Sequence, residues 1–174
     1  MGKLSGKEIL MIIAKDQFRD EEYDEPRKIF ESEGASITVA SSSLNKSKGM
    51  LGKIVQPDIL ISDVKAQDYD AVIFVGGYGS SEYWDNPTAH KIAKDAYSAG
   101  KVLCAICIAP VTLARAGLLK GKKATVYPSE IDKIKAGGAI YGGADVEKDG
   151  KIVTASGPAV ASQFGKKVVE AILE

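Results

Sequence analysis

The sequence predicts an α/β protein with three layers, an α/β/α sandwich in which helices cover both faces of a mostly parallel sheet. Runs of consecutive apolar residues, such as 9–14 and 102–106, are typical of strands that are buried on both faces. These runs alternate with segments of helical periodicity, which predicts parallel strands joined by right-handed crossovers. The pair Asp149-Gly150 between two strand-like segments predicts one antiparallel hairpin.

The first half of the chain contains four strand-like segments, which are 9–14, 36–41, 54–61 and 70–75. Pro57 interrupts the third of these segments, so we expect it to form short edge strands. The polar, glycine-bearing stretch 42–52 is expected to be a loop.

Two helices are expected in the same half. The first has an amphipathic pattern over about 21–33, but Pro26 would remove an interior hydrogen bond, which places the start of the helix proper at 24 or 25. The second opens at Asn86, an N-cap residue followed by a proline, and ends near Ser98.

The second half continues the alternation. The expected elements are a strand at 102–106, a helix at 110–116, a short strand at 124–127, a short helix at 130–136, two hairpin strands at 139–147 and 151–155, and a last helix after Gly157-Pro158. There is no internal repeat and no linker, so the chain is predicted to be a single domain, 1–174.

Composition excludes several classes of function. Lysine plus arginine and aspartate plus glutamate both number 23, and this zero net charge gives no indication of nucleic-acid binding. The apolar run near the N-terminus is too short for a signal peptide or a membrane span, so no membrane partner and a cytoplasmic location are expected. Two cysteines in a reducing compartment are not expected to form a stable disulfide.

Cys107 lies at a predicted corner between the strand 102–106 and a helix that begins at Pro110. Free backbone N–H groups and the helix dipole at such a corner favour a thiolate, so we expect the pKa of this thiol to be lowered. The alternative is a buried cysteine that acts only as a small hydrophobic residue.

Three loops at the carboxyl ends of strands could converge on one pocket, as ligand sites do in open α/β sheets. They follow Ala14, Val75 and Ile106. Gly76 and Gly77 would let backbone N–H groups approach a reacting oxygen and form an oxyanion hole with the N–H of Ile108. A glycine pair after a strand can equally be a simple tight turn.

Several segments resemble the DJ-1/PfpI superfamily, which has a glutamine-amidotransferase-like, flavodoxin-type fold. The similar segments are 105–110 around Cys107, the acidic turn 18–22, the Gly-Gly loop 74–77, the segment 126–128 and the hairpin with its closing helix start, 146–158. The corner at Cys107 resembles the nucleophile elbow of this superfamily, a sharp turn between a strand and a helix that carries the cysteine. The resemblance implies that Glu22, four residues before Pro26, contacts this elbow cysteine, and that Tyr127 contributes a pocket hydroxyl. It also implies a homodimer or a larger homo-oligomer.

The sequence departs from the protease-like branch of this superfamily. That branch has a histidine directly after the cysteine, where this chain has Ile108. The only histidine, His90, falls early in a predicted helix, where we expect a solvated face. A Cys–His dyad is therefore not expected at the elbow, and a cysteine peptidase is the least favoured function. Some relatives have a Ser-Arg pair where this chain has Ala155-Ser156. The anion contact that such an arginine would make is therefore not expected here.

The remaining pair, Cys107 and Glu22, leads to two main hypotheses. The resemblance implies a glutathione-independent glyoxalase or deglycase that acts on small reactive carbonyl compounds, or on modified proteins and nucleotides, without a cofactor. The alternative is a redox-sensing or chaperone-like protein without turnover, in which Cys107 is oxidised to sulfenic or sulfinic acid.

Cys104 and Cys107 together spell a CxxC motif, which is typical of thiol redox enzymes. Cys104, however, falls within an apolar strand, so we expect it to be buried and inert. A zinc site is not expected either, because two further soft ligands are missing.

Overall fold

The central sheet of the computed structural model, which describes residues 2–174, has seven strands in the order β10-β11-β7-β6-β1-β2-β5. Their bounds are β1 Glu8–Ile12, β2 Ser36–Ser41, β5 Ile59–Leu60, β6 Ala71–Phe74, β7 Val102–Ile106, β10 Val146–Asp149 and β11 Ile152–Ala155. Neighbouring strands pair in parallel except β10 and β11, which form the predicted antiparallel hairpin. The five long parallel strands follow the flavodoxin-like order 2-1-3-4-5, which confirms the predicted fold class.

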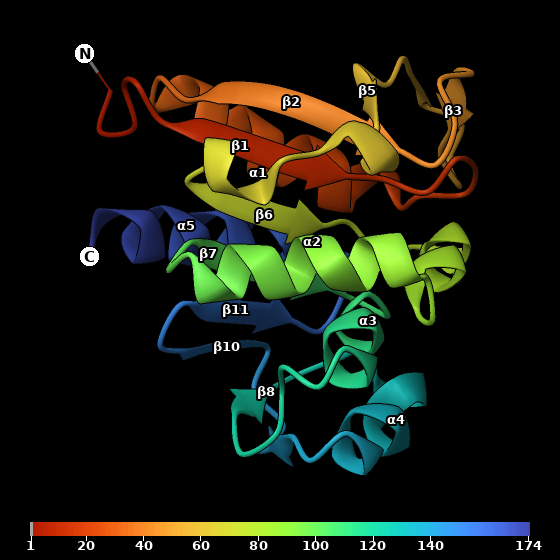
Figure 1. Cartoon of the computed structure of the whole chain (residues 1–174), viewed down its shortest axis with the longest axis vertical. Helices are drawn as coiled ribbons and strands as arrows, with labels where there is room; N and C mark the ends of the chain where they lie inside the picture. Colours follow the sequence, from red (N-terminus) through yellow and green to blue (C-terminus); the bar gives the residue numbers. More distant parts are fainter. Residues whose placement is uncertain (1) are drawn as a thin grey trace.

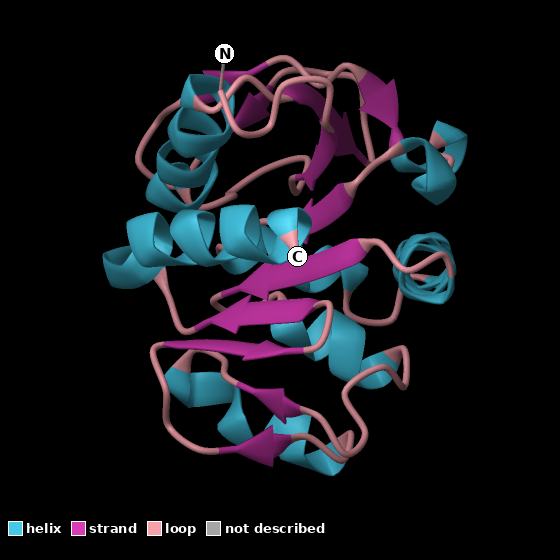
Figure 2. Ribbon diagram, turned by 90° about the vertical axis from the view of Figure 1, so that its left-hand side faces the viewer, coloured by secondary structure: helices cyan, strands magenta, loops and turns pink. Residues whose placement is uncertain are grey.

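Helices cover both faces of this sheet (Figures 1 and 2). The long helices α1 (Asp20–Ser32) and α5 (Ala161–Leu173) pack against each other on one face, and α2 (Pro87–Ser98) and α3 (Pro110–Arg115) lie on the other. Neighbouring residues of β1 alternate between the two buried clusters, because Met11 packs with the first pair of helices and Leu10 with the second. Both faces of β1 are therefore core.

The smaller elements lie at the edges of the main sheet. Two short strands, β3 and β4, pair in antiparallel fashion, and β8 and β9 pair in parallel. The remaining bounds are β3 Ser47–Lys48, β4 Ile54–Val55, β8 Lys123–Ala124, β9 Ile140–Tyr141, α4 Ile131–Ala136, and the 3-10 turns η1 Ile61–Asp63, η2 Ala66–Asp68, η3 Tyr78–Tyr83, η4 Pro128–Glu130 and η5 Pro158–Val160. Among residues 2–174, no helix is long and apolar enough to cross a membrane.

The predicted strand 139–147 is wrong in its middle. Gly142 and Gly143 interrupt it, and Gly143 adopts a positive φ of 79°, which a continuing strand does not allow. Ile140–Tyr141 therefore pairs with β8, and only Val146–Asp149 pairs with β11.

The predicted start of the first helix is also wrong. Helix α1 begins at Asp20 and carries Pro26 in its interior. The missing N–H costs one hydrogen bond to the carbonyl of Glu22. Packing compensates for this loss, because Pro26 lies against Gly165 of α5: a Cβ at Gly165 would be 3.1 Å from the Pro26 Cα. The start of α2 is as predicted, with the Asn86 side chain accepting hydrogen bonds from two backbone N–H groups of the first turn.

The close approach of α1 and α5 gives a first prediction. Gly165→Val should lower the free energy of unfolding by about 1–3 kcal/mol, because the new side chain is forced against Pro26 and Ile29. Urea denaturation measures this change. The matched control is Lys166→Val on the exposed side of the same helix, which should change the stability by no more than about 0.5 kcal/mol. Equal effects of the two variants would contradict the proposed packing.

Candidate active site

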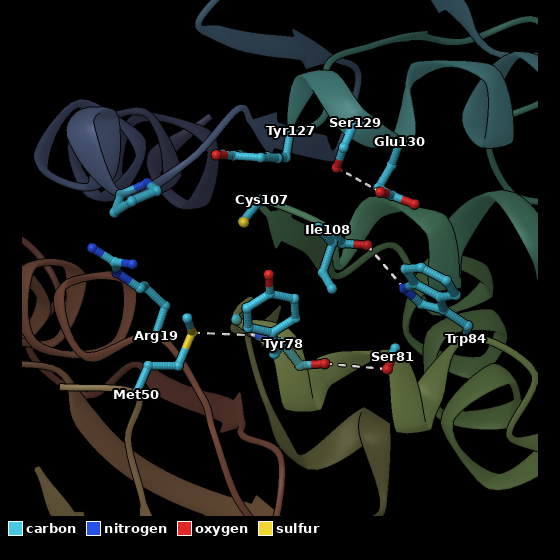
Figure 3. Close-up of a pocket in the computed structure, with 12 residues that line it drawn as sticks. Arg19, Met50, Tyr78, Ser81, Trp84, Cys107, Ile108, Tyr127, Ser129 and Glu130 are labelled. Atoms are coloured by element: carbon cyan, nitrogen blue, oxygen red, sulfur yellow. Dashed lines mark hydrogen bonds between the residues drawn. The ribbon is translucent and has the colours of Figure 1, made fainter. Parts of the chain in front are cut away.

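Three loops meet at the carboxyl edge of β1, β6 and β7, which lie near the middle of the sheet. Together with Met50, the segment 127–130 and Pro158, these loops line a pocket of about 550 Å³ (Figure 3). The pocket is lined by Arg19, Met50, Gly77, Tyr78, Ser81, Trp84, Cys107, Ile108, Tyr127, Ser129, Glu130 and Pro158. The predicted convergence of the three loops is thus observed.

Cys107 occupies the sharp turn between β7 and α3. Its φ of 65° is unusual for a residue other than glycine and indicates a strained corner. Two backbone hydrogen bonds hold this corner: the N–H of Cys107 donates to the Ala155 carbonyl at 2.9 Å, and its carbonyl accepts from the Tyr127 N–H at 2.8 Å. The side chain faces the pocket but is only 8% exposed.

Glu22 comes from the first turn of α1 and is completely buried, with 0% of its surface exposed. Gly76 makes this placement possible. A Cβ at Gly76 would lie 2.4 Å from Glu22 Oε1 and 2.6 Å from Cys107 Cβ, so only glycine lets the three residues meet. The structure therefore brings Glu22 and Cys107 together, with Cys107 in the pocket lining and Glu22 buried behind it.

Burial controls the protonation of Glu22. It raises the pKa of this carboxyl to about 8, although Cys107, the charge of Arg19 and the N–H of Gly76 act in the opposite direction. Within residues 2–174, neither carboxyl oxygen has a hydrogen-bond partner of good geometry. Glu22 is therefore mainly protonated at neutral pH.

The expected lowering of the Cys107 pKa is wrong. Burial and, after it, the negative charge of ionised Glu22 raise the pKa of this thiol to about 12, against the N–H groups of Gly77 and Ile108. The sequence shows the start of a helix, but it does not show that the thiol is buried beside a carboxyl. While Glu22 keeps its proton, the repulsive charge is absent and the carboxyl can donate a hydrogen bond to a thiolate.

The three backbone N–H groups that were predicted to form an oxyanion hole do not all face the same side chain. The N–H groups of Gly77 and Ile108 lie toward the Cys107 sulfur, whereas the N–H of Gly76 lies toward Glu22. Gly77 has a φ of 106°, and a Cβ at this position would be 2.4 Å from the backbone nitrogen of Arg19. Tyr127 lines the pocket and is 43% exposed.

Sequence reasoning did not identify Trp84, which lies at the end of the pocket opposite Arg19 (Figure 3). Its indole N–H donates to the Ile108 carbonyl at 3.0 Å and so supports the elbow backbone. His90 does not reach the pocket. Its Nε2 lies 2.7 Å from the Trp84 carbonyl and its side chain is half-buried, so the expected solvated position is observed only in part.

Cys104 is completely buried and, like Cys107, is a free thiol. Burial raises the pKa of Cys104 well above its usual range, as expected for an inert cysteine. In the described part of the chain, no three His, Cys, Asp or Glu side chains are arranged to hold a metal ion.

Comparisons with known proteins found a matching family and several relatives. The model of the DJ-1/PfpI family matches residues 7–171. An uncharacterized protein of Methanocaldococcus jannaschii is 45% identical over 97% of this chain and 84% of its own length. A deglycase of Pyrococcus abyssi is 32% identical over 86% of this chain and 90% of its own. Other relatives that are 30–33% identical are named deglycase, glutathione-independent glyoxalase or putative cysteine protease.

Solved structures give the same result. The crystal structure of a ThiJ/PfpI domain protein from Brachyspira murdochii superposes with a TM-score of 0.94, at 33% identity and with 97% of both chains covered.

The raised pKa of Glu22 predicts how stability depends on pH. A proton that binds more tightly in the folded state stabilises it fully below the unfolded pKa, near 4.5, and this stabilisation is lost as pH rises toward 8. Relative to Glu22→Gln, the wild type should therefore lose about 3–4 kcal/mol of unfolding free energy between pH 5 and 8.

Urea denaturation at several pH values measures this difference. Glu21→Gln is the matched control, because Glu21 is partly exposed and its ion pair with Arg19 lowers its pKa. Parallel stability curves for the wild type and Glu22→Gln would show that Glu22 is ionised throughout this range.

Proposed function

The chain belongs to the DJ-1/PfpI family, and from this premise we propose that it is a glyoxalase or deglycase-like enzyme that acts on reactive carbonyl compounds or their adducts. Cys107 would be the nucleophile and Glu22 the acid–base group. The observation that carries the proposal is the burial of a protonated carboxyl against a thiol at the floor of an accessible pocket. Self-association and a cytoplasmic location are part of the same proposal.

The chemistry can be written for a small α-oxo-aldehyde such as methylglyoxal. The Cys107 sulfur bonds to the aldehyde carbon, and its proton passes through Glu22 to the new alkoxide, which the N–H groups of Gly77 and Ile108 stabilise. A proton then moves from this carbon to the neighbouring carbon through an enediol. Water cleaves the resulting thioester, which releases lactate and the free thiol. One carbon is oxidised while its neighbour is reduced, so no external oxidant is required.

The pKa of Glu22 suits this role. A general acid–base group is most effective when its pKa is close to the working pH, and a value of about 8 meets this condition. The volume of about 550 Å³ exceeds the need of methylglyoxal alone, which supports adducts on amino acid side chains or nucleotides as further substrates.

A redox-sensing function is the second candidate, and the same carboxyl supports it. A protonated Glu22 can donate a hydrogen bond to a sulfinate on Cys107, which would favour oxidation to that level. A peptidase is less well supported, because Ile108 occupies the histidine position and His90 lies outside the pocket.

Turnover of methylglyoxal tests the enzymatic proposal. Cys107→Ser should reduce lactate formation by at least about 10³-fold, because the hydroxyl is a much weaker nucleophile. Cys104→Ala is the matched control, and it should retain activity within about twofold because its thiol does not line the pocket. Equal activity of the wild type and Cys107→Ser would refute the proposal.

Peroxide treatment followed by intact mass spectrometry separates the two candidates. A sensor should gain two oxygen atoms selectively at Cys107, show no methylglyoxal turnover, and lose this selectivity in Glu22→Ala. An enzyme should show Cys107-dependent turnover of the untreated protein. Oxidation at Cys104 alone would contradict the sensor, since that thiol is completely buried.

A further inference from the structure

Arg19 is the one pocket residue with a positive charge. Among the twelve residues that line the pocket, Arg19 carries the cationic side chain and Glu130 the anionic one. Figure 3 places Arg19 at one end, Trp84 and Glu130 at the other, and Cys107 between them. The two ends of the pocket thus differ in charge.

The guanidinium of Arg19 is oriented by its neighbour. Nε donates to Glu21 Oε1 at 2.9 Å and Nη2 donates to Glu21 Oε2 at 3.0 Å, which is a bidentate contact that fixes the plane of the group. Within residues 2–174, this pair of bonds uses Nε and Nη2, while Nη1 donates to no protein acceptor. The Arg19 side chain is 28% exposed, so a ligand in the pocket can reach it.

Arg19 also lies within electrostatic reach of the reacting groups. The contact with Glu21 raises the pKa of Arg19, and the charges of Glu22 and Cys107 act in the same direction. An anion that binds near Cys107 therefore lies in the field of this guanidinium.

The opposite end of the pocket has no cationic residue in its lining. Glu130 accepts from Lys133 at 2.7 Å and from Ser129 at 2.5 Å, and these contacts keep it ionised. Lys133 and Arg115 also lie over the Trp84 ring and offset this charge, but neither of them lines the pocket.

We propose that Arg19 is a specificity-determining residue that selects carbonyl substrates carrying a carboxylate and orients that carboxylate away from Glu130 while the carbonyl faces Cys107. This inference rests on the proposed function for the identity of the reacting atom. It extends that function by naming a substrate class, namely carboxylate-bearing aldehydes and dicarbonyl compounds, and by assigning Arg19 to their recognition.

Two alkylating reagents test the subsite without any turnover. Iodoacetate and iodoacetamide both transfer a two-carbon group to the Cys107 thiolate with loss of iodide, but only iodoacetate carries a carboxylate. The measured quantity is the rate constant of iodoacetate at Cys107 divided by that of iodoacetamide. Both rates are followed by mass spectrometry of the intact protein in a Cys104→Ala background. Because both reagents require the same thiolate, changes in the pKa of Cys107 cancel in the ratio.

Arg19→Met should lower this ratio by about fivefold, the factor expected for one partly exposed charge contact. Glu21→Gln should raise it, because the guanidinium loses its competing carboxylate. Lys28→Met is the matched control: it removes one positive charge from the exposed side of the same helix and should leave the ratio unchanged. An unchanged ratio in Arg19→Met, or an equal fall in Lys28→Met, would overturn the proposal.

A binding measurement keeps the inference testable if Cys107 resists alkylation. In Cys107→Ser, lactate should raise the Tm and the uncharged lactamide should not, and Arg19→Met should abolish the difference between them. Equal effects of lactate and lactamide would overturn the subsite. A positive result here, together with no methylglyoxal turnover by the wild type, would leave the anion subsite standing while refuting the enzymatic proposal.

Discussion

The site depends on one close contact, in which the buried carboxyl of Glu22 lies against Gly76 and the elbow cysteine, Cys107. Because the carboxyl is buried away from water, its pKa is raised to about 8. A neutral carboxyl beside a thiol can donate a hydrogen bond to a thiolate, whereas an ionised carboxyl opposes thiolate formation. The protonation of Glu22 therefore acts, after burial, on the pKa of Cys107.

The order of the strands explains how this contact arises. The strands β1, β6 and β7 are neighbours in the sheet, so the turn after β1, the Gly-Gly loop and the elbow leave the same edge. The first turn of α1 is held by the Arg19 N–H, which donates to the Gly76 carbonyl, and by Asp20, which accepts from the N–H groups of Leu51 and Lys53. Packing against α5 holds the rest of the helix, even though Pro26 interrupts its hydrogen bonds. The fold thus places groups far apart in sequence, Glu22 and Cys107, at one point.

Much of this arrangement could be predicted from the sequence. Apolar runs located the strands, the Asn86 cap located a helix start, and the resemblance to a family paired Glu22 with Cys107. The pKa of Cys107 could not be predicted, because burial depends on tertiary packing rather than on the local strand-to-helix pattern. Neither Trp84 nor Arg19 was identified as a pocket residue, since a single aromatic or charged residue has no periodic signal. The two errors in the secondary structure have different origins. Packing against α5 keeps Pro26 inside a helix, whereas the positive φ of Gly143 breaks the predicted strand 139–147.

The most direct test of the central claim is a titration of the Glu22 carboxyl, followed by its ¹³C NMR signal and assigned by comparison with Glu22→Gln. The account predicts a midpoint near pH 8, with the carboxyl mainly protonated at neutral pH. A midpoint at or below about pH 5, as for an ordinary glutamate, would contradict it.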